Sequence, residues 1–239
     1  PIYPSHRAEL GGKVLVDNIS LKFPSPATTT VLPTPLLMAK VPKDPLQTYT
    51  IKIMVLSDCT FSLNEINTHI ARLKERFPQV GVSLSVVGPT PQPLPSGLGQ
   101  LGSALTTEPG AIPKEEEKLV EAYGDSAAAK TITVIYCKSI FRGGKFINGY
   151  TRISSKPDYD RNVFIGSAAV TMYTLAHEIG HALTGRGHYG GGAERDYQSN
   201  APVHKVQHNL LKASTIDSSR IGGSKRLYQV QENLIRAQK

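Results

Sequence analysis

The chain has 239 residues, of which 39% are apolar and 19% charged, and its formal net charge is +8. This composition supplies a hydrophobic core for one large domain, or for a domain with a smaller addition, and excludes a largely disordered protein. Because no run of eighteen apolar residues occurs, a membrane-spanning helix is excluded as well.

The first 48 residues are expected to form an extension ahead of the main domain. Residues 13–23 alternate in part between apolar and polar side chains, which indicates a short strand. From Pro24 to Pro45 the chain has six prolines and three consecutive threonines, so neither a regular helix nor a central strand is expected there. The chain begins at Pro1 without a basic and apolar leader, which is typical of a processed or excised product.

The main domain is predicted to open with a strand, a helix and a second strand. Residues 49–57 alternate and are rich in β-branched side chains, which indicates the first strand. Ser62 and Glu65 have the spacing of a capping box, apolar residues then recur at helical intervals, and Pro78 ends the helix. Residues 80–87 are predicted to form the second strand. This order favours two parallel strands joined by a right-handed crossover.

The elements that follow complete an α/β pattern. A loop rich in proline and glycine is expected over 88–112, and then a helix at 113–123, whose three glutamates fit a helix N-terminus. The nearly continuous apolar run at 131–137 is typical of a central buried strand. Two further strands and a long helix are expected at 145–154, 161–166 and 167–183. The predicted fold is a mixed, mostly parallel sheet with an antiparallel edge strand.

The chain has only two cysteines, Cys59 and Cys137, so a disulfide scaffold is excluded. Each lies in or just after an apolar strand-like run, where a buried free thiol is common. A single bridge between neighbouring strands is the alternative.

The strongest functional signal is the sequence HEIGHALTGRGH, which begins at His177. His177 and His181 are four residues apart, so on a helix both imidazoles project from one face and can reach one metal ion. Glu178 lies beside them, where a carboxylate can take a proton from a water that the metal activates. Gly185 permits a sharp turn, after which His188 can supply a third nitrogen ligand. Three protein ligands and one open position are typical of a catalytic zinc site.

The helix that carries this motif is predicted to be buried on its other face. Met172, Leu175, Ile179 and Leu183 are spaced three, four and four residues apart, which forms an apolar stripe. A glycine inside a helix costs about 1 kcal/mol, so Gly180 predicts that another part of the chain packs closely there.

Residues after the motif could supply a different third ligand. Glu194 and Asp196 offer carboxylates, although the surrounding glycines do not favour a helix, and His204 and His208 offer imidazoles. Tyr189 could donate a hydrogen bond to an oxyanion or simply pack against the site.

The motif resembles that of the metzincin clan of zinc metallopeptidases, H-E-x-x-H-x-x-G-x-x-H followed by a methionine-containing turn. This chain has one residue more between His181 and Gly185, and no methionine follows Met172. Residues 208–215, HNLLKAST, resemble that turn with Leu211 in place of the methionine.

The resemblance implies a zincin-type catalytic domain over 49–239, with a first part over 49–185 and a smaller, irregular part over 186–239. It implies Zn²⁺ as the cofactor and Leu211 as the apolar floor below the metal. It also implies that an edge strand binds extended substrate. Residues 147–153 are the candidate for that strand, which makes Gly149 and Tyr150 candidate substrate-binding residues.

The sequence therefore predicts a zinc-dependent endopeptidase that hydrolyses proteins or peptides with Glu178 as the general base. One alternative is an inactive zinc-binding interaction module, which would not need Glu178. Another is a binder of nucleic acid or anionic surfaces through residues 201–239, which hold seven basic against two acidic residues. That segment lacks a run of aromatic residues for stacking, so a nucleic-acid partner is not expected. By analogy with the family, we expect a secreted protein, or one delivered as a toxin or effector.

Overall fold

The structure is a computed structural model, and all of its described residues belong to the second of two units into which the chain divides, Met38–Lys239. The described residues are 47–99, 102–107, 112–124, 130–152, 161–166, 172–186, 210–211 and 229–237. The expected extension up to residue 46, including the strand at 13–23, lies outside them. The boundaries proposed for the extension and for the two parts of the main domain therefore stay predictions.

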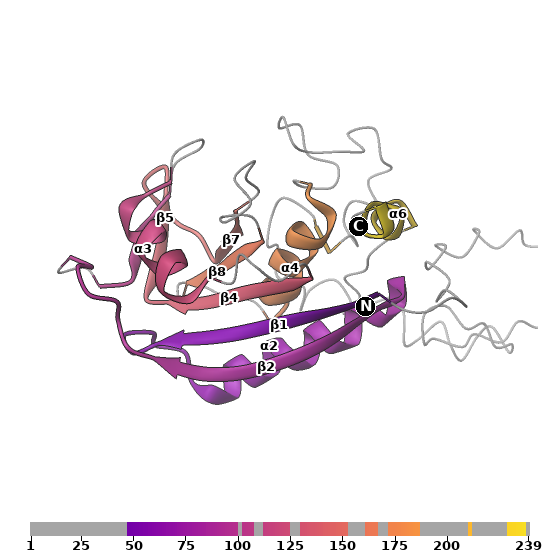
Figure 1. Cartoon of the computed structure of the whole chain (residues 1–239), viewed down its shortest axis with the longest axis horizontal. Helices are drawn as coiled ribbons and strands as arrows, with labels where there is room; N and C mark the ends of the chain where they lie inside the picture. Colours follow the sequence, from indigo (N-terminus) through magenta and orange to yellow (C-terminus); the bar gives the residue numbers. More distant parts are fainter. Residues whose placement is uncertain are drawn as a thin grey trace, which may run out of the picture. The chain divides into compact units, whose positions relative to one another are not determined.

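A five-stranded sheet forms the centre of this unit, in the order β2-β1-β4-β8-β7 (Figure 1). Its strands are β1 (Gln47–Leu56), β2 (Val82–Gln92), β4 (Thr131–Cys137), β8 (Asn162–Gly166) and β7 (Gly149–Thr151). The first four strands pair in parallel, and β7 pairs antiparallel with β8 at the edge. The predicted fold class, a mixed and mostly parallel sheet with an antiparallel edge strand, is confirmed.

Local sequence signals account for the helix between β1 and β2. Helix α2 (Leu63–Arg76) begins with the predicted capping box, in which the Ser62 hydroxyl accepts from the Glu65 backbone and the Glu65 carboxylate accepts from the Ser62 N–H. A short 3-10 helix, η1 (Phe77–Val80), follows it. Gly81 then takes a φ of +69°, which favours glycine, and leads directly into β2.

The two faces of the sheet carry different helices. Along β4, Ile132, Val134 and Tyr136 lie in one hydrophobic core with α2 and α4 (Thr174–Thr184), whereas Ile135 and Cys137 lie in a second core with α3 (Lys114–Tyr123). This alternation follows from the two-residue period of a strand. A strand with both faces covered needs a continuous apolar sequence, and β4 has one.

Several predicted boundaries differ in the structure. Strand β2 extends to Gln92 through Pro89 and Pro91, which an edge strand tolerates because it need not donate every backbone hydrogen bond. The expected loop at 88–112 also contains β3 (Ala104–Thr106). This strand joins β5 (Ser139–Arg142) and β6 (Lys145–Phe146) in a second, three-stranded sheet.

Helix boundaries need correction too. Pro113 is the N-cap of α3, not its first helical residue. Helix α4 begins at Thr174, so Met172 precedes it and is 39% exposed, outside the predicted apolar stripe. Near the C-terminus, the described residues include helix α6 (Gln229–Ala237).

The described residues resolve one alternative, the disulfide bridge. Cys59 and Cys137 are both free thiols, and Cys137 is buried. None of the helices in the described ranges is both long enough and apolar enough to cross a membrane.

Candidate functional site

Helix α4 brings together three residues of the motif, His177, Glu178 and His181. Leu175, Ile179 and Leu183 are fully buried on its core face, as the spacing predicts. The helix ends at Thr184, and Gly185 is its C-cap. The φ of +62° at Gly185 confirms the predicted turn, and its N–H donates to the His181 carbonyl.

The two histidines direct their Nε2 atoms toward one point. These atoms are 3.0 Å apart, and the ring planes are nearly perpendicular, at 86°. Two nitrogens that bind one zinc at tetrahedral geometry would be separated by roughly 3.3 Å, given Zn–N distances near 2.0–2.1 Å. The pair is therefore close to the spacing that a shared metal requires.

Hydrogen bonds fix the tautomer of both rings. Nδ1 of His177 lies 2.6 Å from the Leu210 carbonyl oxygen, and Nδ1 of His181 lies 2.8 Å from that of Arg186. A carbonyl only accepts, so each Nδ1 is the donor, and when both rings are neutral each Nε2 presents a lone pair to the other ring. Two facing lone pairs repel each other, and a cation between them removes the repulsion. Metal-binding histidines are held by backbone carbonyls in this way.

Glu178 lies buried beside the pair and contacts the edge strand. The Thr151 hydroxyl is 2.9 Å from Oε2 of Glu178 and 2.7 Å from its backbone carbonyl oxygen. Burial raises the pKa of the Glu178 carboxyl to about 8, and the hydrogen bond from Thr151 acts in the opposite direction. A cation at the histidine pair would also lower this pKa, so the carboxylate form is favoured when a metal is bound.

A turn at Leu210 and Leu211 packs under the helix at the predicted position. A Cβ on Gly180 would lie 2.6 Å from Cδ2 of Leu211, so the predicted close packing at this glycine is confirmed. Leu211 is fully buried, and the neighbouring Leu210 carbonyl accepts from His177. The turn therefore combines an apolar contact below the helix with a hydrogen bond to one ring. Whether Leu211 is the floor of a metal site stays a prediction.

Strand β7 lies against α4 and includes both candidate substrate-binding residues. Gly149 faces Glu178, whereas the Tyr150 side chain is buried in the core on the opposite face of the sheet. Any pairing of Tyr150 with substrate would therefore involve its backbone.

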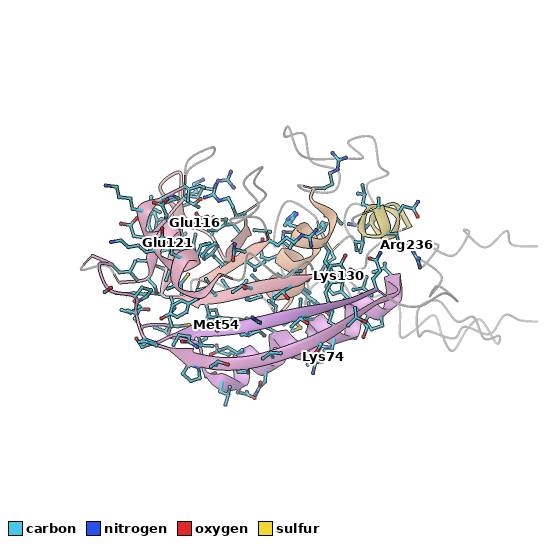
Figure 2. All side chains as sticks on the ribbon, in the orientation of Figure 1. Met54, Lys74, Glu116, Glu121, Lys130 and Arg236 are labelled. Atoms are coloured by element: carbon cyan, nitrogen blue, oxygen red, sulfur yellow. The ribbon has the colours of Figure 1, made fainter. Side chains whose placement is uncertain are left out.

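A buried ion pair behind β7 was not predicted. Glu116 of α3, labelled in Figure 2, is completely buried. It accepts from Nε and Nη2 of Arg152 at 2.7 and 2.5 Å, and also from the Tyr150 hydroxyl. The sequence holds a signal for it, because Glu116 is three and four residues before the apolar Leu119 and Val120 on one helix face. Because Glu116 is one of three consecutive glutamates, the sequence indicated only a helix N-terminus at this point.

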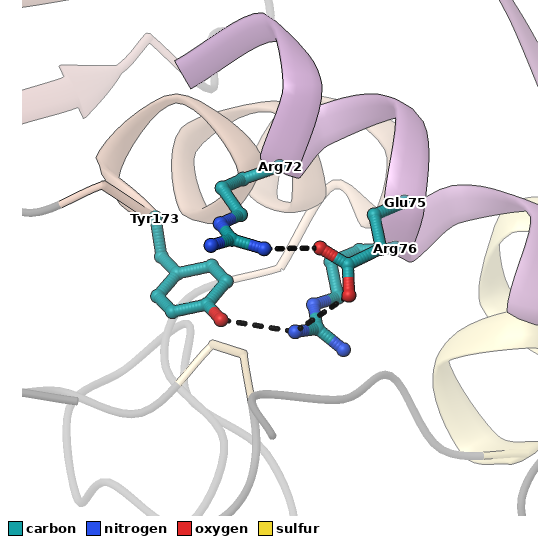
Figure 3. A network of polar contacts seen from close by, with 4 residues as sticks. All are labelled: Arg72, Glu75, Arg76 and Tyr173. Carbon is teal, nitrogen blue, oxygen red and sulfur yellow. Dashed lines mark hydrogen bonds and ion pairs between the residues drawn. The ribbon is translucent and has the colours of Figure 1, made fainter. Parts of the chain in front are cut away.

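A second polar network joins α2 to the start of α4 (Figure 3). Nη2 of Arg76 donates to the Tyr173 hydroxyl at 2.9 Å, and its guanidinium lies over the Tyr173 ring. Glu75 pairs with both Arg76 and Arg72. Since Tyr173 directly precedes α4, this network helps to fix where the motif helix begins.

The predicted third ligand, His188, lies outside the described residues. So do the alternative ligands, which are Glu194, Asp196, His204 and His208, and the candidate oxyanion donor Tyr189. Within the part of the chain that the structure describes, no group of three His, Cys, Asp or Glu side chains gathers at one point. The described residues therefore offer the imidazoles of His177 and His181 as metal ligands, with the carboxylate of Glu178 beside them.

Comparisons with known proteins were made by sequence and by structure. No protein-family model matches the chain, and no curated protein matches it. Among solved structures, the chain is similar to metalloproteinase-II from Bacteroides fragilis, with 13% identity over 82% of this chain and a TM-score of 0.50. It spans about half of that protein, 55% of its length. Archaemetzincin from Methanopyrus kandleri matches at 13% identity over 82% of this chain and 97% of its own, with a TM-score of 0.46.

The likeness to the metalloproteinase concerns the fold. At this identity it shows that the chain has a zincin-type fold, in agreement with the motif resemblance. The roles of the individual residues depend on the geometry described above.

Proposed function

We propose that this protein is a zinc-dependent peptidase in which His177 and His181 bind the metal and Glu178 is the general base. The observation that carries the proposal is the pair of imidazoles on α4, with Nε2 atoms 3.0 Å apart and each Nδ1 held by a backbone carbonyl. An ordinary surface histidine pair needs neither a fixed tautomer nor a buried carboxylate beside it. The fold of a metalloproteinase supports the same conclusion.

The donor set fits zinc. Neutral imidazoles suit Zn²⁺, and three ligands with an open position are usual at catalytic sites. We propose His188 as the third ligand, because it follows the turn at Gly185. A zinc ion bound here would polarise a peptide carbonyl and lower the pKa of a bound water toward neutrality.

The chain's own residues would handle the proton and the substrate. The Glu178 carboxylate would accept a proton from the attacking water and then deliver it to the leaving amine nitrogen. Strand β7 is the last strand of the five-stranded sheet, and an extended peptide would bind along it through backbone hydrogen bonds. Because those bonds involve no particular side chain, they suit a protein or peptide substrate.

A peptide-library digest tests the proposal. Zinc-loaded wild type is expected to cleave peptides internally, cleavage should stop with a chelator and return with zinc, and Glu178→Gln should keep zinc but lose at least about 1,000-fold in kcat. Glu121→Ala, at an exposed residue on α3, is a matched control that should cleave normally. Unchanged cleavage by Glu178→Gln would sink the mechanism. Zinc binding by a wild type that cleaves nothing would instead favour the inactive zinc-binding module.

A further inference from the structure

The face of β7 toward α4 is formed by two small residues, Gly149 and Thr151. Gly149 pairs with Ile165 and Thr151 pairs with Val163, and both partners belong to the core that contains α4. Tyr150 points to the opposite core. The strand can approach the helix closely because neither residue has a large side chain.

Both residues meet Glu178. A Cβ on Gly149 would lie 3.1 Å from Cγ of Glu178 and 2.9 Å from the Phe164 carbonyl oxygen, so no side chain fits between strand and carboxyl stem. The Thr151 hydroxyl is within hydrogen-bond distance of Oε2 and of the backbone carbonyl of the same glutamate, at 2.9 and 2.7 Å. The stem is thus confined on one side, and one carboxylate oxygen faces a fixed donor.

The other face of β7 is fixed as well. Tyr150 and Arg152, on either side of Thr151, both bond to the buried Glu116 of α3. Charge-assisted, bidentate hydrogen bonds of this kind fix geometry more firmly than neutral hydrogen bonds do. Thr151 is therefore held in place by its neighbours and presents its hydroxyl from a rigid strand.

We propose that Thr151 is a positioning residue for the general base. Its single hydroxyl proton is shared between Oε2 and the backbone carbonyl of Glu178, and the contact with Oε2 leaves Oε1 to receive the proton. This role rests on the proposed function. In the reaction, a proton of the attacking water moves to Oε1 as the new C–O bond forms. The same proton then moves to the amine nitrogen as the C–N bond breaks. A carboxylate that is already oriented loses little freedom in these steps, and small errors in such geometry reduce rates strongly.

The test compares two substitutions at Thr151 with a matched change on the opposite face of the sheet. Thr151→Val removes the hydroxyl but keeps the shape, and Thr151→Ser keeps the hydroxyl. Thr133→Val is the control, because Thr133 is also a buried strand threonine, and its hydroxyl has no hydrogen-bond partner within the described part of the chain. All are assayed with zinc loaded, on peptides that wild type cleaves.

Thr151→Val is expected to lower kcat by about 10- to 100-fold with KM within about twofold, while zinc content and the thermal midpoint stay near wild type. Thr151→Ser should recover kcat to within a few-fold, and Thr133→Val should match wild type. A crystal structure of Thr151→Val should show the Glu178 carboxylate turned from its wild-type orientation.

Three outcomes would overturn the inference. In the first, Thr151→Val keeps the wild-type kcat. In the second, Thr151→Ser is as slow as Thr151→Val, which would mean that the shape of the side chain matters and its hydroxyl does not. In the third, the Glu178 carboxylate keeps its orientation in the valine variant. In each case wild type still cleaves and the proposed function stands. A wild type that binds zinc and cleaves nothing would overturn both.

Discussion

Replacing Gly180 by alanine is expected to destabilise the protein, although alanine favours helices more than glycine does. The added methyl would lie 2.6 Å from Cδ2 and 3.3 Å from Cγ of Leu211. Leu211 is fully buried in the core, so its side chain can shift only within that core. Overpacking of this kind costs about 2 kcal/mol, whereas the gain in helix propensity is about 1 kcal/mol. The expected net loss is therefore about 1 kcal/mol of unfolding free energy.

The same substitution should weaken metal binding. Displacing Leu211 also moves the neighbouring Leu210 carbonyl, which accepts from Nδ1 of His177. Loss of such an outer hydrogen bond typically lowers metal affinity by about 10- to 100-fold. Urea unfolding of the zinc-free protein measures the first effect, and zinc titration measures the second.

A double-mutant cycle with Leu211→Val tests the reasoning. Shortening Leu211 removes the clash, so Gly180→Ala should be neutral or stabilising by up to about 1 kcal/mol in that background. If Gly180→Ala stabilises the protein with Leu211 intact, the helix and the turn are not in the contact described, and the reasoning fails.

Two further predictions concern buried charge. His69 is a buried residue of α2. Burial lowers the pKa of its imidazole from 6.5 to about 4, so the neutral form contributes stability that is complete above pH 6.5 and is lost as the pH falls through 4. The unfolding free energy should therefore fall by about 3 kcal/mol over this pH range. In His69→Gln the unfolding free energy, measured with urea, should depend less on pH. An unchanged pH dependence in that variant would refute the prediction. Glu116→Ala leaves the guanidinium of Arg152 mostly buried without its carboxylate, and should cost about 3 kcal/mol. The exposed Glu121→Ala on the same helix should change stability by less than about 0.5 kcal/mol, and equal losses in the two variants would contradict the buried pair.

Elements with a local signal could be predicted from the sequence. The capping box at Ser62 and the continuous apolar run of β4 each depend on residues close in the chain, and both lie where expected. Gly180 could also be interpreted locally, since an interior helix glycine indicates a close neighbour. It did not identify Leu211 as that neighbour, because the resemblance named Leu211 only as the floor below the metal.

Features that depend on distant residues could not be predicted. The hydrogen bond from Thr151 to Glu178 joins residues 27 apart, and the bond from Arg152 to Glu116 joins residues 36 apart. No periodicity links such positions, because the parallel crossovers of the sheet decide which residues meet. Helix α6 does carry a local signal, since Gln231 and Ile235 are four residues apart and both buried.

Zinc titration by calorimetry is the most direct test of the central claim that His177 and His181 bind one metal for use by Glu178. The account predicts one zinc per chain in wild type and in Glu178→Gln with similar affinity. It also predicts a loss on the order of 100-fold or more in His177→Ala and His181→Ala, because a ligand matters at least as much as its supporting hydrogen bonds. Undiminished zinc binding by either histidine variant would contradict the claim.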